Sequence, residues 1–433
     1  MRTVLLVSLT FPPSQVAGVH RVRHLAKYLP RFGWYPIVVT VDERYHKESA
    51  DPRLGRLVSE RTEVHRIGAS PPWATSWLGV GDLALRAMVP LARKLNALMK
   101  ERRPDVIFIT GWPFYQMLLG ERLRARGARV VLDFQDPWVS AEGATKSRWS
   151  KGGMAHRLAV LLEPGAVRHA DLVTSVSDIQ NQQMAARYPW LDPRRMAAIP
   201  IGGDPEDFDA LRAEPPDNPH IQLDRRHVNL SYVGTFLPRA GSLVRTLFSA
   251  VRALKHSDPD LAARMRLNFV GTSNQPDDTS SYRVKPLAEE AGIAELVREV
   301  PQRIPYLQAL GVLAASDGLL LIGSDEPHYT ASKIYPALMA GRPFMSLFHR
   351  ASGAHAILSA AGGGRALSFD DVHGLEAQAS SITDALRTLA CCPEKLGRVD
   401  PAAYASYTAE AVSKRFAEFF DGLIVEQPVK VHA

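Results

Sequence analysis

Short apolar runs alternate with amphipathic stretches along most of the chain, and this alternation restricts the fold more than any other feature. In the first half the apolar runs contain few polar residues, which is typical of parallel strands buried on both faces. Helices and strands in this repeated order predict a doubly wound α/β fold. We expect strands at Val4–Ser8, Pro36–Val41, Val106–Thr110, Val130–Phe134, Leu172–Ser175 and Ala197–Ile199, and helices at Val19–Leu29, Leu83–Met99 and Gln116–Arg126.

The alternation stops in the middle of the chain and then starts again. The stretch Asp204–Arg226 contains four prolines and seven acidic residues but almost no apolar run, so we expect a linker there. After it we expect strands at Leu230–Val233, Met265–Val270, Val297–Val300, Gly318–Ile322 and Arg342–Phe348, and helices at Ser242–Leu254, Lys285–Ala291, Tyr306–Ala315, Ala331–Ala340, Leu375–Leu389 and Ala409–Ile424.

The fold class is therefore predicted as α/β, with two Rossmann-like domains whose parallel sheets face a cleft. The predicted division is a first domain of residues 1–204, a linker of residues 205–226 and a second domain of residues 227–405. A C-terminal helical segment, residues 406–433, completes the chain.

Composition excludes several other classes of protein. Apolar residues make up 46% of the 433 residues and charged residues 22%, which excludes a disordered or fibrous chain. The two cysteines, Cys391 and Cys392, are adjacent, which excludes a disulfide scaffold and a cysteine zinc site. This use of cysteine is typical of a cytosolic protein, so we expect a cytoplasmic location. No run approaches the ~20 apolar residues of a membrane-spanning helix. The formal charge of +7 suits an anionic partner without requiring one.

The loop after the first predicted strand is a candidate anion site. It ends at Gly18 and leads into a helix whose first turns carry Arg21 and Arg23. Loops at the carboxyl ends of strands bind ligands in open α/β sheets, and the N–H groups at a helix start attract anions. Positive side chains are unfavourable there unless an anion balances them. The alternative is an ordinary surface helix with solvated basic residues.

Two carboxylates, Asp133 and Asp136, follow another predicted strand within the segment Asp-Phe-Gln-Asp-Pro-Trp. A carboxylate at this edge of the sheet could orient a sugar hydroxyl or act as a base. Asp-Pro is equally typical of a turn, in which case Trp138 would only pack against the core. Both interpretations remain open.

The second half carries two comparable loops. Gly234 and Arg239 lie between a predicted strand and a predicted helix, where glycine permits close approach of a diphosphate and arginine can neutralise it. Ser332 and Lys333 lie near the start of another helix, a second position suited to an anion, and Glu326 could hold a ribose diol. The alternative makes Ser332 a helix cap and Lys333 a solvated side chain.

These motifs, in this order, resemble the GT-B type glycosyltransferases, and among them the retaining bacterial family four (glycosyl transferases group 1). The resemblance covers nearly the whole chain. Each motif alone is common, whereas their order and spacing together are specific. The matching segments are Leu5–Ser8 with Phe11-Pro12-Pro13, Gly18–Arg23, Pro104–Ile107, Asp133–Trp138, Ala170–Ser177, Ile199–Asp204 and Ser332–Pro343.

The resemblance implies transfer of a sugar from a nucleotide-sugar, held by the second domain, to a lipid-linked or polysaccharide acceptor, held by the first. It also implies that the C-terminal segment crosses back to the first domain. The implied reaction is retaining and metal-independent and uses no cofactor, and positive groups stabilise the departing diphosphate. The implied residues are Asp136, Lys333 and Arg239 for catalysis, Gly18, Gly234, Thr235, Glu326, Thr330 and Ser332 for the donor, and Arg21 and Arg23 for the acceptor. A peripheral contact with the inner face of a membrane stays open.

The chain departs from the family pattern in its donor loops. Pro336 and His328 occupy the positions of the family's second and first glutamate. The basic positions of the family's glycine-rich loop hold Thr235 and Ala240, with Arg239 one residue before the latter. These departures keep open a non-catalytic GT-B protein that binds a nucleotide or glycan. A nucleotide-sugar epimerase is a third hypothesis without a convincing acid and base set, and no nucleic-acid partner is expected because aromatic and basic residues are not interleaved.

Overall fold

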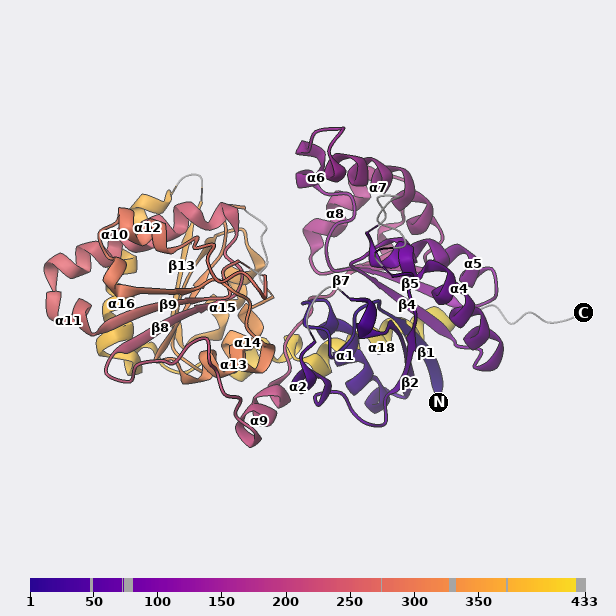
Figure 1. The fold of residues 1–433 in the computed structure, drawn as a ribbon, viewed down its shortest axis with the longest axis horizontal. Coiled ribbons are helices and arrows are strands. Elements are labelled where there is room, and N and C mark those ends of the chain that lie inside the picture. The colour runs from indigo at the N-terminus through magenta and orange to yellow at the C-terminus, as the bar shows by residue number, and fades with distance from the viewer. Residues whose placement is uncertain are drawn as a thin grey trace, which may run out of the picture. The chain divides into compact units, whose positions relative to one another are not determined.

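The computed structural model describes residues 1–46, 50–71, 73, 81–273, 275–326, 332–370 and 373–425. The chain divides into two compact units: unit 1 comprises Met1–Ile201 and the chain from Ala409 onward, and unit 2 comprises Gly202–Thr408. Each unit has a parallel sheet with helices on both sides (Figure 1). The predicted α/β class with two Rossmann-like sheets is confirmed.

Unit 1 is built on a sheet that has seven strands in the described part of the chain, in the order β3-β2-β1-β4-β5-β6-β7. All of its pairings are parallel. The chain runs outward from β1 to β3 and then returns to β4, so the order changes direction between β1 and β4. The strands are β1 (Arg2–Val7), β2 (Trp34–Val41), β3 (Glu63–Ile67), β4 (Val106–Gly111), β5 (Arg129–Phe134), β6 (Leu172–Ser175) and β7 (Met196–Ala198).

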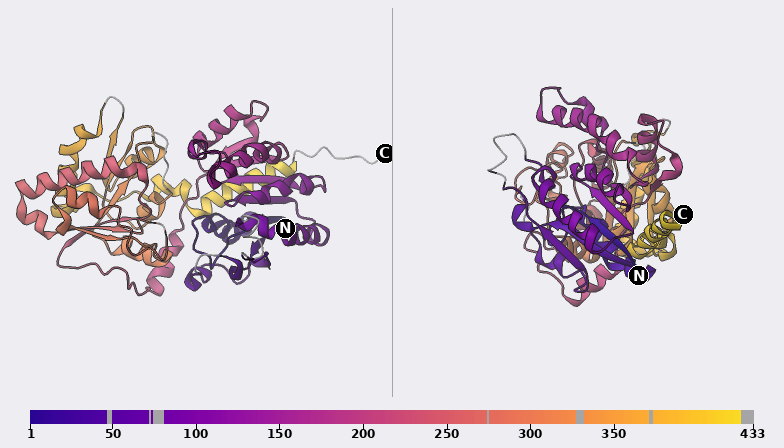
Figure 2. Two further views of the ribbon diagram at one scale, coloured as in Figure 1. Left: turned by 45° about the horizontal axis from the view of Figure 1, so that its top comes forward. Right: turned by 90° about the vertical axis from the view of Figure 1, so that its right-hand side faces the viewer.

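Helices cover both faces of this sheet because alternate side chains of a strand point to opposite sides. Leu5 and Val7 of β1 belong to the same buried cluster as side chains of α4, α5 and α7, whereas Val4 and Leu6 belong to a cluster with α1 and α18. Figure 2 shows the yellow α18 lying along unit 1. The helices are α1 (Val19–Tyr28), α2 (Pro52–Gly55), α4 (Leu83–Glu101), α5 (Gly120–Arg124), α6 (Ala141–Thr145), α7 (Lys151–Arg168), α8 (Asp178–Arg187) and α18 (Ala409–Val425).

Unit 2 repeats this architecture with the strand order β10-β9-β8-β11-β12-β13, again wholly parallel. The order changes direction between β8 and β11. The strands are β8 (Val228–Val233), β9 (Met265–Val270), β10 (Val297–Val300), β11 (Gly318–Ile322), β12 (Phe344–His349) and β13 (Gly364–Phe369). The helices are α9 (Pro205–Ala213), α10 (Gly241–Ser257), α11 (Pro259–Arg264), α12 (Lys285–Glu290), α13 (Tyr306–Ala315), α14 (Ile334–Met339), α15 (Gly353–Ala361), α16 (Ala379–Cys391) and α17 (Pro401–Tyr404).

The structure differs from the sequence analysis in several respects. The expected linker begins with helix α9, which buries Phe208 and Leu211 within unit 2. Strands β3 and β13 were not predicted, because edge strands carry polar and small residues and show a weak apolar pattern. Helices α2, α6, α7, α8, α11, α15 and α17 were also not predicted.

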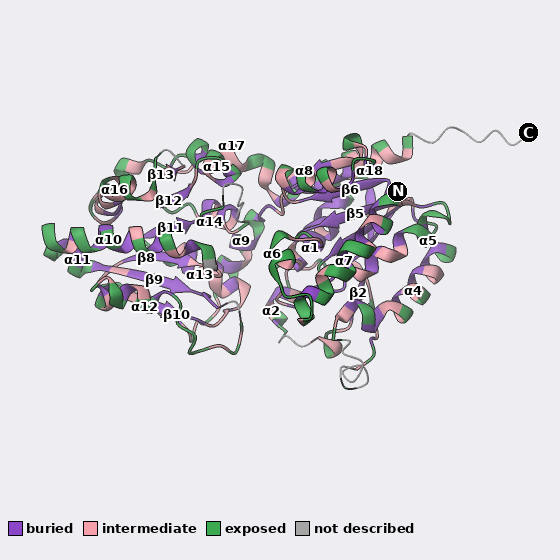
Figure 3. Ribbon diagram, turned by 90° about the horizontal axis from the view of Figure 1, so that it is seen from above, coloured by how far each residue is buried: buried purple, intermediate pink, exposed green. Residues whose placement is uncertain are grey.

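The core of each sheet is buried, while most outward helix surfaces are exposed (Figure 3). No helix within the described ranges is both long enough and apolar enough to span a bilayer.

Replacement of Phe416 in α18 by alanine should strongly destabilise unit 1. The ring is fully buried, and its centroid lies 5.3 Å from that of Phe108 in an edge-to-face arrangement. Loss of such a side chain costs about 3–5 kcal/mol. All seven tryptophans of the chain lie in unit 1, so urea unfolding followed by tryptophan fluorescence reports on this unit. The exposed neighbour Glu418→Ala is the control, and an equal midpoint for both variants would contradict the packing role.

Candidate functional site

The best candidate for a ligand site in unit 2 lies at the carboxyl edge of its sheet, between β8 and β11. Open α/β sheets bind ligands where the strand order changes direction, because the two loops that leave adjacent strands separate there. The loop after β8 carries Gly234, Thr235 and Arg239, and the loop after β11 leads through Glu326 to Lys333. The predicted donor residues Gly234, Thr235, Glu326 and Ser332 are therefore on these two loops, together with Lys333.

Lys333 is the cation at the centre of this arrangement. It is half-buried, and its ammonium lies 4.0 Å from the centroid of the Tyr232 ring. The same ammonium donates a hydrogen bond to the hydroxyl of Tyr232, which donates in turn to the carbonyl of Thr235 at 2.7 Å. A neutral phenol at the end of β8 thus fixes the position of the charge.

Burial lowers the pKa of Lys333 from its ordinary value to about 7. The desolvated ammonium loses part of its hydration, and a phenol compensates less than a carboxylate would. An anion that binds beside the ammonium would restore the charged form. Such a group is therefore poised to respond to a diphosphate.

Gly234 provides close access to this lysine. Its φ is +136°, a conformation that side chains rarely adopt, and its N–H donates to the carbonyl of Val270 at 2.8 Å. A Cβ at this position would lie 3.2 Å from Cδ of Lys333. Only glycine leaves the backbone here both unstrained and open.

The two predicted groups Arg239 and Glu326 lie together, but they pair with one another. The Nη1 of Arg239 lies 3.0 Å from Oε1 of Glu326, and its Nε lies 2.6 Å from Oδ1 of Asp325. All three side chains are exposed. A diphosphate would therefore have to replace these carboxylates at Arg239, which is feasible because exposed ion pairs contribute little.

The remaining donor predictions in unit 2 have less structural support. Ser332 is exposed, and its carbonyl accepts a hydrogen bond from the N–H of Tyr335. The predicted helix from Ala331 begins only at Ile334, with Lys333 as the residue before it. Thr330 lies outside the described residues.

Unit 1 places its first loop in a tight polar contact. The carbonyl of Gly18 accepts a hydrogen bond from the amide of Gln135 at 3.2 Å, and that amide also donates to Thr110 at 2.8 Å. Helix α1 begins at the next residue, as expected. Gly18 has helical φ and ψ, so its backbone does not require glycine.

Arg21 and Asp133 form a buried ion pair and are structural groups. The Nε of Arg21 donates to Asp133 at 3.2 Å, and its Nη atoms donate to the carbonyls of Ile199 and Pro200. Asp133 also accepts hydrogen bonds from the hydroxyls of residues Thr110 and Thr174. Both side chains are fully buried, so Arg21 does not present its guanidinium to an acceptor, and Asp133 does not reach the surface of the sheet edge.

Arg23 also differs from the expected acceptor contact. It is buried, with Nη2 at 3.2 Å from a ring nitrogen of His20 and at 2.9 Å from one of His24. Burial and the adjacent arginine lower the pKa of His24. Asp136, in contrast, is exposed in the loop after β5, where an acceptor group is expected.

The sequence analysis missed Tyr232 as a site residue. Its only signal is its place two residues before Gly234, at the end of a strand, where a buried aromatic residue is also ordinary core. The contact with Lys333 comes from the other loop, so a single local motif could not reveal it.

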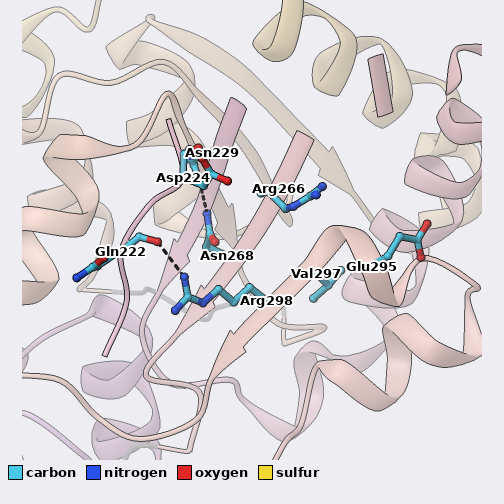
Figure 4. Close-up of a pocket in the computed structure, with 8 residues that line it drawn as sticks. All are labelled: Gln222, Asp224, Asn229, Arg266, Asn268, Glu295, Val297 and Arg298. Carbon is cyan, nitrogen blue, oxygen red and sulfur yellow. Dashed lines mark hydrogen bonds between the residues drawn. The ribbon is translucent and has the colours of Figure 1, made fainter. Parts of the chain in front are cut away.

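A hollow in unit 2 lies at the opposite edge of the sheet from Lys333. It has a volume of about 170 Å³ and is bounded by the starts of β8, β9 and β10 (Figure 4). Its buried amides are engaged, since Asn268 donates to Asn229 at 3.2 Å. Arg298 donates to the carbonyl of Gln222 at 2.8 Å. These contacts join the starts of the strands and are structural.

Two units, each with a wholly parallel sheet covered by helices, define the GT-B fold. Residues 17–202 match the family model of the glycosyl transferase 4-like domain, which lies in unit 1. The predicted GT-B fold is confirmed. A comparison with curated protein sequences found no match.

Solved structures resemble the chain over nearly its whole length. HepE of Anabaena, in complex with UDP and glucose, is 15% identical with a TM-score of 0.59 and covers 98% of this chain and 100% of its own. WaaG, a glycosyltransferase involved in lipopolysaccharide biosynthesis, is 15% identical with a TM-score of 0.59 and covers 97% and 100%. A Listeria monocytogenes protein provisionally described as a UDP-N-acetylglucosamine 2-epimerase is 13% identical with a TM-score of 0.53 and covers 98% and 97%. At these identities the likeness shows the fold.

Binding of a diphosphate beside Lys333 should take up a proton above pH 7. In the free protein the ammonium loses its proton as the pH rises through about 7, whereas an adjacent anion raises the pKa in the complex. The affinity should be constant below this pH and fall up to about tenfold per pH unit above it. Calorimetric titration with a nucleotide-sugar, in two buffers of different ionisation enthalpy, measures the uptake. Lys333→Arg stays charged and should show none; a wild-type protein without buffer dependence would contradict the assignment.

Gly234→Ala should weaken binding of the same ligand. The substitution imposes an unfavourable φ, which costs about 1–3 kcal/mol, and its Cβ crowds Lys333. We expect a higher dissociation constant in calorimetry and a lower melting temperature of unit 2 by circular dichroism. Gly374→Ala is the control, because a Cβ there meets nothing within 4 Å. Equal affinity in both variants would show that the ligand does not approach Gly234.

Proposed function

We propose that the chain transfers a sugar from a nucleoside diphosphate sugar to a lipid-linked or polysaccharide acceptor in the cytoplasm. One observation carries the proposal: the ammonium of Lys333 is fixed at the carboxyl edge of unit 2, beside the open backbone of Gly234. A cation and an accessible glycine on adjacent loops suit a diphosphate, which carries negative charge on oxygens that need close contacts. A uridine nucleotide is the first donor to test, because HepE was solved with UDP and with UDP-glucose.

The proposed chemistry is metal-independent. When the bond between sugar and diphosphate breaks, negative charge develops on the departing diphosphate, and a fixed ammonium stabilises it. Lys333 would supply this charge, with Arg239 as a second group once it leaves its carboxylate partners. Retention of configuration is part of the proposal and rests on the family resemblance.

On the acceptor side the proposal assigns Asp136, the exposed carboxylate after β5. Such a group can orient or deprotonate a hydroxyl of the acceptor. Arg21 is not retained in this role, since its guanidinium is held by Asp133 and two carbonyls.

A second candidate function is a non-catalytic protein that binds a nucleotide or glycan. It is favoured by Pro336, which stands in the first turn of α14 where the related family has a carboxylate. Turnover distinguishes the two functions, because GT-B architecture is shared with proteins of other reactions.

A thermal-shift screen with UDP, GDP, ADP and their sugars, with and without magnesium, tests the proposal. A bound donor at 100 times its dissociation constant should stabilise the protein by about 2.7 kcal/mol. We expect one base to produce the shift, unaffected by magnesium, and Lys333→Ala to lose it. Lys395→Ala removes an exposed lysine of unit 2 and should keep it.

Release of nucleoside diphosphate then separates the two candidates. Slow hydrolysis of the stabilising donor, or transfer to an added glycan, supports the transferase. A shift without any turnover supports the binding protein. No shift with any nucleotide would overturn the transferase and leave only a protein that binds a glycan.

A further inference from the structure

The exposed apolar side chains of unit 1 are concentrated on one short segment. Among the described residues, thirteen large hydrophobic side chains are exposed, and five of them lie between positions 149 and 161. Single exposed apolar residues are ordinary, whereas a contiguous group marks a contact surface. The five are Trp149 at 87% exposure, Met154 at 58%, Leu158 at 39%, Val160 at 49% and Leu161 at 73%.

Helix α7 carries four of these side chains, and three of them form a regular pattern. Met154, Leu158 and Leu161 are separated by four and three residues, so they form one stripe along the helix. The opposite side of the helix, which includes Ala159 and Ala166, is buried against unit 1. The outward stripe of a soluble helix is normally polar, and here it is apolar. Figure 3 shows the exposed surfaces of α6 and α7 in green.

Positive charges flank this stripe. Between positions 141 and 168, which span α6 and α7, the exposed basic residues are Lys146, Arg148, Lys151, Arg157 and Arg168. The segment has two acidic residues: Glu142 pairs with Lys146, and Glu163 is buried, where it accepts a hydrogen bond from Tyr188. An apolar stripe flanked by lysine and arginine, with a tryptophan beside it, is the pattern of a helix that lies in the interface of an anionic membrane.

We infer that this α7 surface, Trp149, Met154, Leu158 and Leu161 with the flanking basic residues, docks on an anionic lipid bilayer. The shared positive charge favours lipid over a second copy of the chain, because two such surfaces would repel one another. The apolar stripe would enter the boundary between head groups and acyl chains, while the basic side chains reach the phosphates.

The chain topology places this surface close to the ligand edge of unit 1. Only residues 169–171 separate the end of α7 from the start of β6, so the helix ends at the amino edge of the sheet. Its 18 residues extend about 27 Å, so Trp149 and Met154 lie toward the carboxyl edge, where Asp136 follows β5. This orientation brings a lipid-linked acceptor to that edge; only this last step rests on the proposed function.

Vesicle sedimentation with the full chain tests the docking surface. We expect binding to equimolar phosphatidylcholine and phosphatidylglycerol vesicles, weakened by salt, and much less binding to pure phosphatidylcholine. The triple variant Met154→Ser, Leu158→Ser and Leu161→Ser should lower the partition coefficient at least tenfold, since each removes apolar area from the contact. Lys151→Glu with Arg157→Glu, which leaves the stripe intact, should weaken binding to the anionic vesicles alone.

The controls change an exposed apolar and an exposed basic residue of unit 2, Tyr282→Ser and Arg264→Glu. Both variants should bind the vesicles as the wild type does. Equal binding by the triple variant, or no binding by the wild type, would overturn the inference. A wild-type dimer in analytical ultracentrifugation that the triple variant abolishes, with vesicle binding unchanged, would assign the surface to a second copy and also overturn it. The donor thermal shift is measured on the same proteins, so a failed donor site and a failed lipid surface are separate results.

Discussion

Parallel pairing of every strand is the constraint on which the arrangement of both units depends. Two consecutive parallel strands require a connection that returns the chain to the side of the sheet where the strands begin. The carboxyl ends of all strands therefore lie on the same side. In unit 2 this brings the ends of β8 and β11 side by side, and with them Gly234 and the loop that leads to Lys333. Residues far apart in the sequence meet because the connections return by helices that bury both faces. The site is a consequence of the topology.

Charged side chains near the two sheets serve different purposes because their partners differ. The guanidinium of Arg21 is buried with a carboxylate and two carbonyls, and removal of one partner would leave an uncompensated charge. Such a group stabilises the arrangement of its own loops. The ammonium of Lys333 is held by a neutral phenol, and burial lowers its pKa to about 7. Its charge is available for a ligand. Both cations are desolvated, and the difference in their partners separates the structural cation from the functional one.

The sequence predicted the class of fold well, because buried parallel strands have continuous apolar runs that stand out in any stretch. It missed β3 and β13 because each pairs on one side only and carries polar or small residues. For the site, loop position and residue type singled out Gly234 and Lys333. The same reasoning misjudged Arg21, since a basic residue at a helix start gives no sign of whether Asp133 of a distant strand will cover it. Tyr232 was missed for the same reason: its role exists only through a contact between loops.

Pro336 stands where the similar family has a glutamate, and its position near Lys333 suggests what the missing carboxylate changes. It follows Lys333 by three residues at the start of α14, so a glutamate there would be a neighbour of the lysine along the helix. A carboxylate partner would hold the ammonium charged in the absence of a ligand; with proline, the charge depends on what binds. The nearby carboxylates of Asp325 and Glu326 form ion pairs with Arg239. A donor diphosphate would then supply the negative charge that Lys333 lacks and would replace the carboxylates at Arg239. The stabilising effect of both cations would be largest at the moment when the bond between diphosphate and sugar breaks.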